Sequence, residues 1–271
     1  MKKFLKKIFG GLVVVGLLGG CREKNAEIKS DAAGTNPIIE RKIPSENAAT
    51  NRAEKPVEKI RPLMVGGGAS HDFARWFNQS DSVTMAVLNN ASVDYTEKLE
   101  FVLSMLKDHD ALYLCANQKM EDPAVRKGIF DFADSGKGLI LVHPALWYNW
   151  KDWPEYNRVL VGGGANSHDK YGEFEVTVTE PNHPVMGGVP KTFKTSDELY
   201  HFEQDKNGTP IQVLATAKSP LTGKTFPVVW IMKHPKTRIV CITLGHDGVT
   251  HDSEPYRAIL KNSLNWVTAK K

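Results

Sequence analysis

Short apolar runs alternate with helix-like segments over residues 61–142, and this alternation restricts the fold more than any other feature of the chain. Apolar strand-like runs fall at Leu63–Val65, Val83–Leu88, Ala111–Cys115 and Gly138–Val142. Between them, Tyr95–Leu106 has helical spacing, and Asp122-Pro123 is typical of a capped helix start. Alternating strands and helices require right-handed crossovers, so we predict an α/β fold with a mainly parallel sheet.

The second half of the chain lacks long helices between its strands. Glu173–Thr179 alternates apolar and polar residues, as a half-solvated strand does. Further strand-like runs lie at Ile211–Ala215, Val228–Met232 and Arg238–Thr243, followed by an amphipathic helix over Glu254–Val267. The pattern predicts an antiparallel C-terminal extension of the sheet.

The first 20 residues are typical of an export signal, with four lysines before a short apolar segment. They end in Leu18-Gly19-Gly20-Cys21, which resembles the lipobox of bacterial lipoproteins. The resemblance implies cleavage before Cys21, lipidation of Cys21, and anchoring in the bacterial cell envelope, on the periplasmic or outer surface. The alternative is an ordinary signal peptide with a chance cysteine.

Removal of residues 1–20 would leave 31 basic and 31 acidic residues, because the whole chain has 35 against 31. A neutral mature chain offers no electrostatic basis for binding nucleic acid. Residues 21–60 are polar and lack aromatic side chains, so they predict a flexible tether. One domain is expected over residues 61–271.

Five of the nine histidines follow a strand-like run or a glycine-rich turn: His71, His143, His168, His201 and His246. Side chains at the carboxyl ends of parallel strands face the crevice where ligands bind. Histidine is suited to proton transfer and to metal binding near neutral pH. We therefore expect a site there, whereas His109, His234 and His251 have surface or turn positions, with His251 near the same rim.

Asp197 and Glu198 form an acidic pair that is either solvated or functional. In the functional alternative, one orients a histidine and the other is a general base or metal ligand. The triple glycines that contain Gly67 and Gly164 match neither a P-loop nor a dinucleotide site. They predict tight loops whose backbone approaches a ligand closely.

Three tryptophans follow His143 within a polar segment, Trp147, Trp150 and Trp153. They either pack onto the domain or form a carbohydrate platform, because sugar rings stack on aromatic side chains. Trp147, Trp150 and, further along, Tyr200 and His201 are the candidate substrate contacts. Cys115 and Cys241 lie in apolar runs and are expected as buried free thiols, with a disulfide open if their strands are neighbours.

Several motifs occur in order: Gly67-Gly68 with His71, Leu141-Val142-His143, Gly162-Gly163-Gly164 with His168, His183-Pro184-Val185, Asp197-Glu198-Leu199-Tyr200 and Leu244-Gly245-His246. Over residues 61–269 this series resembles the ThuA-like, or trehalose-utilisation, family. The resemblance implies a flavodoxin-like three-layer sandwich related to class I glutamine amidotransferases, and a role in sugar metabolism. Where those amidotransferases carry a nucleophilic cysteine after a strand, this chain has His143 and then Pro144. Thioester chemistry needs a thiolate, so we do not expect a glutaminase.

Three hypotheses remain open from the sequence. The first is an enzyme acting on a sugar or keto-sugar by histidine and carboxylate acid–base chemistry. The second is a centre for a divalent metal such as zinc, held by three imidazoles and a carboxylate from separate strands. The third is a lipid-anchored protein that binds glycans without catalysis. The partners expected are a small carbohydrate and the membrane, and the sequence does not indicate an oligomeric state.

Overall fold

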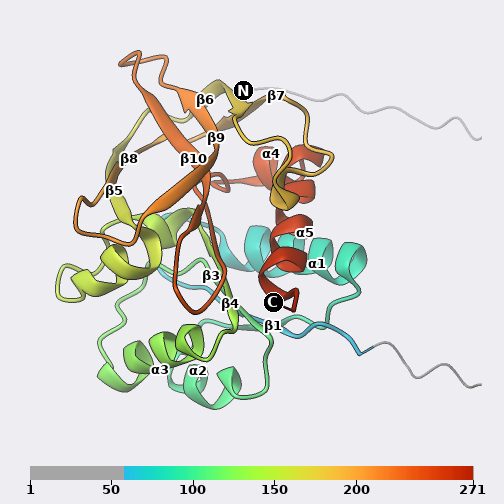
Figure 1. Cartoon of the computed structure of the whole chain (residues 1–271), viewed down its shortest axis with the longest axis vertical. Helices are drawn as coiled ribbons and strands as arrows, with labels where there is room; N and C mark the ends of the chain where they lie inside the picture. The colour runs from blue at the N-terminus through green and yellow to red at the C-terminus, as the bar shows by residue number, and fades with distance from the viewer. Residues whose placement is uncertain (1–57, 271) are drawn as a thin grey trace, which may run out of the picture. The chain divides into compact units, whose positions relative to one another are not determined.

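The structure is a computed structural model that describes residues 58–270. The expected signal peptide, Cys21 and almost all of the tether lie outside these residues. The described chain forms a nine-stranded sheet in the order β2-β1-β3-β4-β11-β10-β9-β6-β7 (Figure 1). Neighbouring strands from β2 to β11 pair in parallel, and those from β11 to β7 pair antiparallel. The predicted α/β fold, with a mainly parallel sheet and an antiparallel extension, is confirmed.

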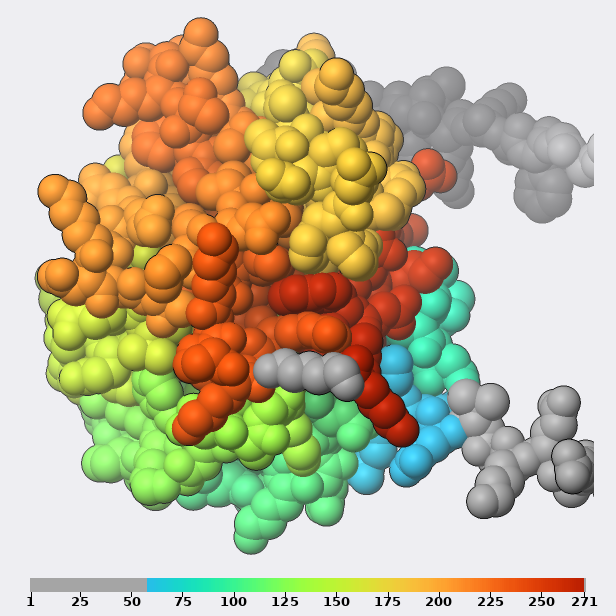
Figure 2. Space-filling view, viewed as in Figure 1, coloured from blue at the N-terminus to red at the C-terminus, as the bar shows by residue number. Residues whose placement is uncertain are grey.

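The parallel half comprises β1 (Pro62–Val65), β2 (Asp94–Thr96), β3 (Ala111–Leu114), β4 (Gly138–Val142) and β11 (Ile239–Ile242). The extension comprises β6 (Gly172–Val178), β7 (Thr192–Asp197), β9 (Ile211–Lys218) and β10 (Thr225–Met232). A separate two-stranded sheet pairs β5 (Gly163–His168) with β8 (Tyr200–Gln204). In Figure 2 the orange and yellow residues of the extension occupy the upper part of the view.

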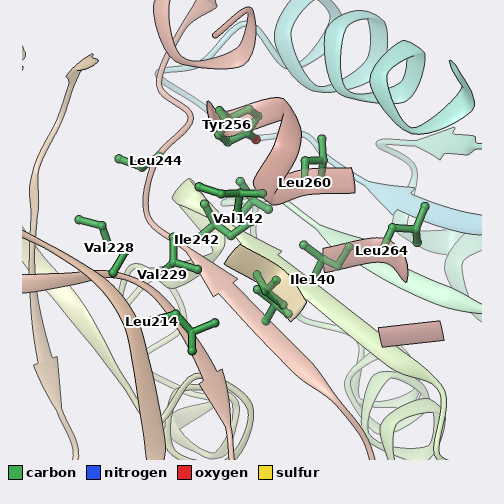
Figure 3. Close-up of a cluster of buried hydrophobic side chains, with 14 of the residues drawn as sticks. Ile140, Val142, Leu214, Val228, Val229, Ile242, Leu244, Tyr256, Leu260 and Leu264 are labelled. Carbon is green, nitrogen blue, oxygen red and sulfur yellow. The ribbon is translucent and has the colours of Figure 1, made fainter. Parts of the chain in front are cut away.

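Helices cover both faces of the parallel half, as the alternation of elements predicted. On one face lie α1 (Ser82–Asn89) and α5 (Glu254–Thr268), and on the other α2 (Leu99–Leu106) and α3 (Pro123–Asp134). Figure 3 shows the hydrophobic core on the face covered by α1 and α5, where Leu260 and Leu264 of α5 pack near Ile140 of β4. Because β4 is buried along its whole length, its side chains pack into both layers.

Two expected elements differ from the structure. The apolar run Val83–Leu88 was expected as a strand but belongs to α1. Its apolar residues do not all face the core, since Val83 is 59% and Val87 72% exposed while Met85 is buried. The strand that pairs with β1 at the edge of the sheet is instead the short β2, most of which the sequence analysis assigned to the start of a helix.

The second glycine-rich segment also differs from its expected conformation. It was expected as a loop, but it forms β5, whose pairing with β8 includes Gly164 opposite Glu203. The backbones approach closely here, because a Cβ on Gly163 would lie 2.1 Å from the Glu203 carbonyl oxygen. Across residues 58–270, no helix is both long enough and apolar enough to cross a membrane.

Candidate metal centre

Four side chains from separate segments converge at the carboxyl edge of the parallel strands. His71 follows β1, His143 follows β4 directly, His246 follows β11, and Glu198 lies in the turn between β7 and β8. One nitrogen of each histidine and one oxygen of Glu198 all lie within 4.8 Å of one another. The parallel sheet explains the convergence of the three histidines, because it brings the carboxyl ends of its strands to one edge, whereas Glu198 reaches this edge from the antiparallel extension.

His143 is held rigidly at the end of β4. The parallel register of β4 with β11 pairs Val142 with Ile242, so His143 lies beside Thr243. Its Nδ1 donates to the Thr243 carbonyl oxygen at 2.5 Å. A carbonyl can only accept, so Nδ1 carries the proton and Nε2 offers a lone pair. His143 is completely buried, and Nε2 has no hydrogen-bond partner among residues 58–270.

His71 has the same arrangement of its two nitrogens. Nδ1 lies 3.1 Å from the carbonyl oxygen of Ala69, and Nε2 is buried without a partner in the described chain. The rings of His71 and His143 stand edge to face with centroids 4.9 Å apart. Burial lowers the pKa of His71 and, more strongly, that of His143, so both imidazoles are neutral near neutral pH.

His246 and Glu198 form the charged half of the cluster. Nδ1 of His246 lies 3.2 Å from Oε2 of Glu198, although the two are not aligned as a hydrogen bond within the described residues. The interaction with Glu198 raises the pKa of His246. Burial alone would raise the pKa of Glu198, but His246 and the neighbouring histidines lower it below its ordinary value. Glu198 is therefore an ionised carboxylate.

Asp197 is buried beside the cluster but does not offer it a free oxygen. Its Oδ1 accepts from the Glu198 amide at 2.7 Å, and its Oδ2 accepts from the Gly245 amide at 2.8 Å and the Thr250 hydroxyl at 2.6 Å. Asp197 thus ties the segment that carries Glu198 to the segment that carries His246. It orients the cluster, and Glu198 alone of the acidic pair faces the histidines.

The donor set suits a divalent transition ion. Three imidazole nitrogens and a carboxylate oxygen are ligands that zinc accepts, at roughly 2.0–2.2 Å. Such bond lengths place tetrahedral ligand atoms about 3.3 Å apart. The Glu198 oxygen lies 3.2 Å from His246 Nδ1 and 3.7 Å from His143 Nε2, close to that separation. Buried polar atoms without partners are rare in native proteins, and a bound ion would satisfy all three nitrogens.

A cavity of about 260 Å³ opens beside the cluster. Its wall includes Ser70, His71, Asn117, Pro144, Trp147, Asn149, His168, Glu198 and Tyr200. Tyr200 stacks on His143 with centroids 4.5 Å apart, and Trp147 meets Tyr200 edge to face at 5.2 Å. Nδ1 of His168 donates to the Asp169 carbonyl oxygen at 2.7 Å. Aromatic faces, amides and two of the four clustered side chains, His71 and Glu198, therefore share one cavity.

A family model described as ThuA, trehalose utilisation, matches residues 45–267. The chain belongs to the ThuA family. Solved structures similar to it include ThuA-like proteins from Parabacteroides merdae (TM-score 0.66, 20% identity, 78% of this chain and 90% of that chain covered) and Bacteroides uniformis (0.65, 19%, 82% and 95%). A glutamine amidotransferase from Thermotoga maritima is also similar (0.50, 11%, 79% and 100%). No curated protein matches the chain.

The similarity to an amidotransferase extends to the fold but not to a nucleophile. In this ThuA chain His143 directly follows β4 and has a φ of +42°, a conformation that non-glycine residues rarely adopt. Both described cysteines, Cys115 and Cys241, are free and fully buried, and burial raises the pKa of each thiol. The expected buried free thiols are confirmed, and neither lines the cavity.

Other candidate residues of this ThuA chain lie away from the cavity. Trp150 is only 4% exposed and donates to the Gln118 carbonyl oxygen, so it packs in the core, which is the alternative to substrate contact that the sequence left open. His201 contacts Asp169 at 2.8 Å and stacks on Phe226 instead. Gly67 and Gly164 pack against side chains, where a Cβ would lie 2.6 Å from Gln118 and 2.7 Å from Asn157.

Two histidines expected at the surface are buried. His109 is 3% exposed and contacts Asp94 at 2.9 Å. His251 is fully buried and contacts Asp81 at 2.7 Å. The sequence analysis missed Asp81 altogether, because it lies in a polar stretch next to an apolar run and 170 residues from its partner. It also missed Ser70, Asn117 and Asn149, whose residue types carry no local signal for a cavity wall.

Proposed function

We propose that this ThuA-family protein is a metal-dependent enzyme that acts on a sugar or keto-sugar. The observation that carries the proposal is the convergence of three partnerless, buried imidazole nitrogens on the Glu198 carboxylate. Backbone carbonyls fix the protons of His71 and His143 on Nδ1, which leaves their Nε2 lone pairs for an ion. Acid–base chemistry by the same three histidines is less well supported, because the three nitrogens face one another.

The lining of the cavity supports a neutral sugar as substrate. Trp147 and Tyr200 offer apolar ring faces, while Ser70, Asn117 and Asn149 offer hydroxyl and amide groups. Its wall carries no lysine or arginine from the described residues, so neither of these cationic side chains is there to pair with a phosphate or a carboxylate. At about 260 Å³ the cavity is smaller than the range of roughly 300–1,000 Å³ for drug-sized ligands, which favours one sugar ring.

We assign different roles in the proposed reaction to the side chains around the cavity. An ion bound at the cluster would act as a Lewis acid on a carbonyl or hydroxyl oxygen of the sugar if that oxygen entered as a fifth ligand beside the four side chains. His168, whose Nδ1 lies 3.8 Å from Oε1 of Glu198, would move a proton at the substrate. Trp147 would hold the sugar ring, and the amides of Asn117 and Asn149 would orient its hydroxyls.

Glycan binding without catalysis has weaker support. It would need an exposed aromatic platform, but Trp150 and Trp153 are buried in the core and only Trp147 reaches the cavity. Three histidines and a carboxylate would also have no role in simple stacking.

The place of action is a further part of the proposal. The motif that ends in Cys21 supports a lipid anchor in the bacterial cell envelope. If Cys21→Ser leaves the protein in the membrane fraction, the anchor is wrong. Release of the protein into the soluble fraction would support it.

Elemental analysis of the purified full chain tests the metal, and turnover of disaccharides and their keto forms tests the reaction. We expect one equivalent of a transition metal and activity that chelation removes and zinc or another divalent ion restores. A chain that takes up no metal and turns over sugars unchanged in chelator would contradict the proposal.

A further inference from the structure

A buried polar network adjoins the proposed metal-binding cluster through Gly245. It consists of Asp81, at the end of the helical segment Phe73–Asp81, with Tyr113 of β3, His251 of α4 (Gly248–His251) and Tyr256 of α5. All four residues are fully buried. None of them lines the cavity or belongs to the ligand set. Their role therefore needs an explanation other than contact with substrate.

Asp81 is the centre of this network. Its Oδ1 lies 2.7 Å from Nδ1 of His251, while its Oδ2 accepts from the hydroxyls of Tyr113 at 2.5 Å and Tyr256 at 2.9 Å. The other nitrogen of His251, Nε2, lies 3.0 Å from the carbonyl oxygen of Gly245. Both neighbours of the imidazole are acceptors, so both of its nitrogens must donate, and His251 is an imidazolium paired with the Asp81 carboxylate.

Gly245 connects this network to the cluster, because it immediately precedes the ligand His246. Its φ is +128°, and a Cβ there would lie 3.4 Å from Nε2 of His251. Its carbonyl oxygen accepts from His251, and its amide donates to Asp197 at 2.8 Å. Two buried side chains, His251 and Asp197, therefore hold the carbonyl and the amide of Gly245, the residue that precedes His246.

Burying an ion pair in a protein core carries a large desolvation penalty. Removing two charges from water costs several kcal/mol per ion, and apolar residues of similar volume often stabilise a fold as well or better. Groups that hold metal ligands in place are a recognised reason for such polar contacts. The direct chain of contacts from Asp81 through His251 to Gly245 offers that reason here.

We infer that Asp81 and His251 are positioning residues that hold the Gly245 carbonyl and thereby set the direction of His246 toward a metal ion. The inference rests on the proposed metal centre. It deepens that proposal, because it assigns control of metal affinity to a pair of residues that touch neither metal nor substrate. Asp197 performs the matching task on the amide side of Gly245.

Two variants of the full chain test the inference. Asp81→Asn keeps the shape of the side chain but removes its charge. His251→Asn keeps a donor near Nδ1 but is too short to reach Gly245. The matched control is Asp252→Asn, which makes the same chemical change at an exposed carboxylate that contacts Arg257 and Ser80.

Cobalt(II) is the probe, since its visible spectrum reports the geometry of the ligands at saturating metal, whatever the stability of the fold. We expect both variants to bind cobalt about 10- to 100-fold more weakly and with an altered spectrum, as is typical when groups behind metal ligands are removed. The control should match the wild type. Circular dichroism checks that each variant is folded.

The outcomes separate the two proposals. If the wild type binds cobalt and both folded variants bind it with unchanged affinity and spectrum, the positioning role is wrong and the metal centre stands. If the wild type binds neither cobalt nor zinc, the metal centre itself is wrong and the inference falls with it. If one variant fails to fold, the other variant decides by the same two criteria.

Discussion

Oε2 of Glu198 lies 3.2 Å from Nδ1 of His246, which joins the turn between β7 and β8 to the end of β11. The two residues are 48 positions apart in the sequence. One carboxylate from the antiparallel extension thus completes a set of histidines from the parallel half. The extension is therefore part of the site, and removing it would leave three imidazoles without their negative charge.

Glu198→Gln should weaken zinc binding by more than the roughly 10- to 100-fold that is typical of groups behind the ligands. The substitution keeps an oxygen in place but removes the negative charge that favours a divalent cation. Isothermal titration of the metal-free protein with zinc measures the effect. Glu203→Gln, on the exposed side of β8, is the control and should bind zinc as the wild type does. Equal affinities for both variants would exclude Glu198 as a ligand.

His246→Ala should abolish metal-dependent turnover, whereas His201→Ala should retain it. Both histidines follow motifs that the sequence analysis selected, but His201 contacts Asp169 and Phe226 outside the cavity. Initial rates with the most active sugar, measured at saturating zinc, distinguish them. Comparable losses in the two variants would contradict the placement of the site.

Trp147→Ala should affect substrate binding, whereas Trp150→Ala should affect the stability of the fold. Trp147 borders the cavity, so its loss should raise the KM for sugar with little change in the free energy of unfolding. Trp150 is buried, so its loss should lower the free energy of unfolding by about 3–5 kcal/mol. Steady-state kinetics and urea unfolding measure the two quantities. A KM effect confined to Trp150→Ala would reverse this assignment.

The Asp81–His251 pair should make stability depend on pH in the metal-free protein. Burial tends to lower the pKa of His251, but Asp81 raises it above its ordinary value of 6.5. The contribution of the pair to the free energy of unfolding is therefore fully present below pH 6.5, where His251 is protonated in the unfolded chain as well. That contribution is lost as the pH rises through the folded-state pKa.

Asp81→Asn should consequently lower the free energy of unfolding most at pH 6, by about 3 kcal/mol, and less at pH 9. Urea unfolding in chelator at several pH values measures this, with Asp252→Asn as the control. A loss that grows as the pH rises would mean that His251 is neutral in the folded chain.

The sequence predicted the fold and selected the candidate histidines for one physical reason. Buried strands are continuous apolar runs, and a polar residue directly after such a run marks the edge where ligands bind, as His143 after β4 does. The apolar run within Ser82–Asn89 was mistaken for a strand, because a short run of apolar residues is compatible with either a helix or a strand.

Interactions across long sequence separations were beyond prediction. Nothing near Asp81 indicates that it will meet His251, and nothing near Trp150 distinguishes a core tryptophan from one that lines a cavity. In both cases the tertiary packing decides, and it depends on which elements become neighbours.

The four proposed ligands are spread from residue 71 to residue 246, on segments that only the completed sheet brings together. An unfolded chain therefore has no local chelating motif built from them, and the ion would select the native state. Thermodynamic linkage then makes the melting temperature a measure of metal occupancy, with about 2.7 kcal/mol gained at a free metal concentration of 100 times Kd. Thermal shift across a panel of divalent ions would rank the preference of the protein before any substrate is known.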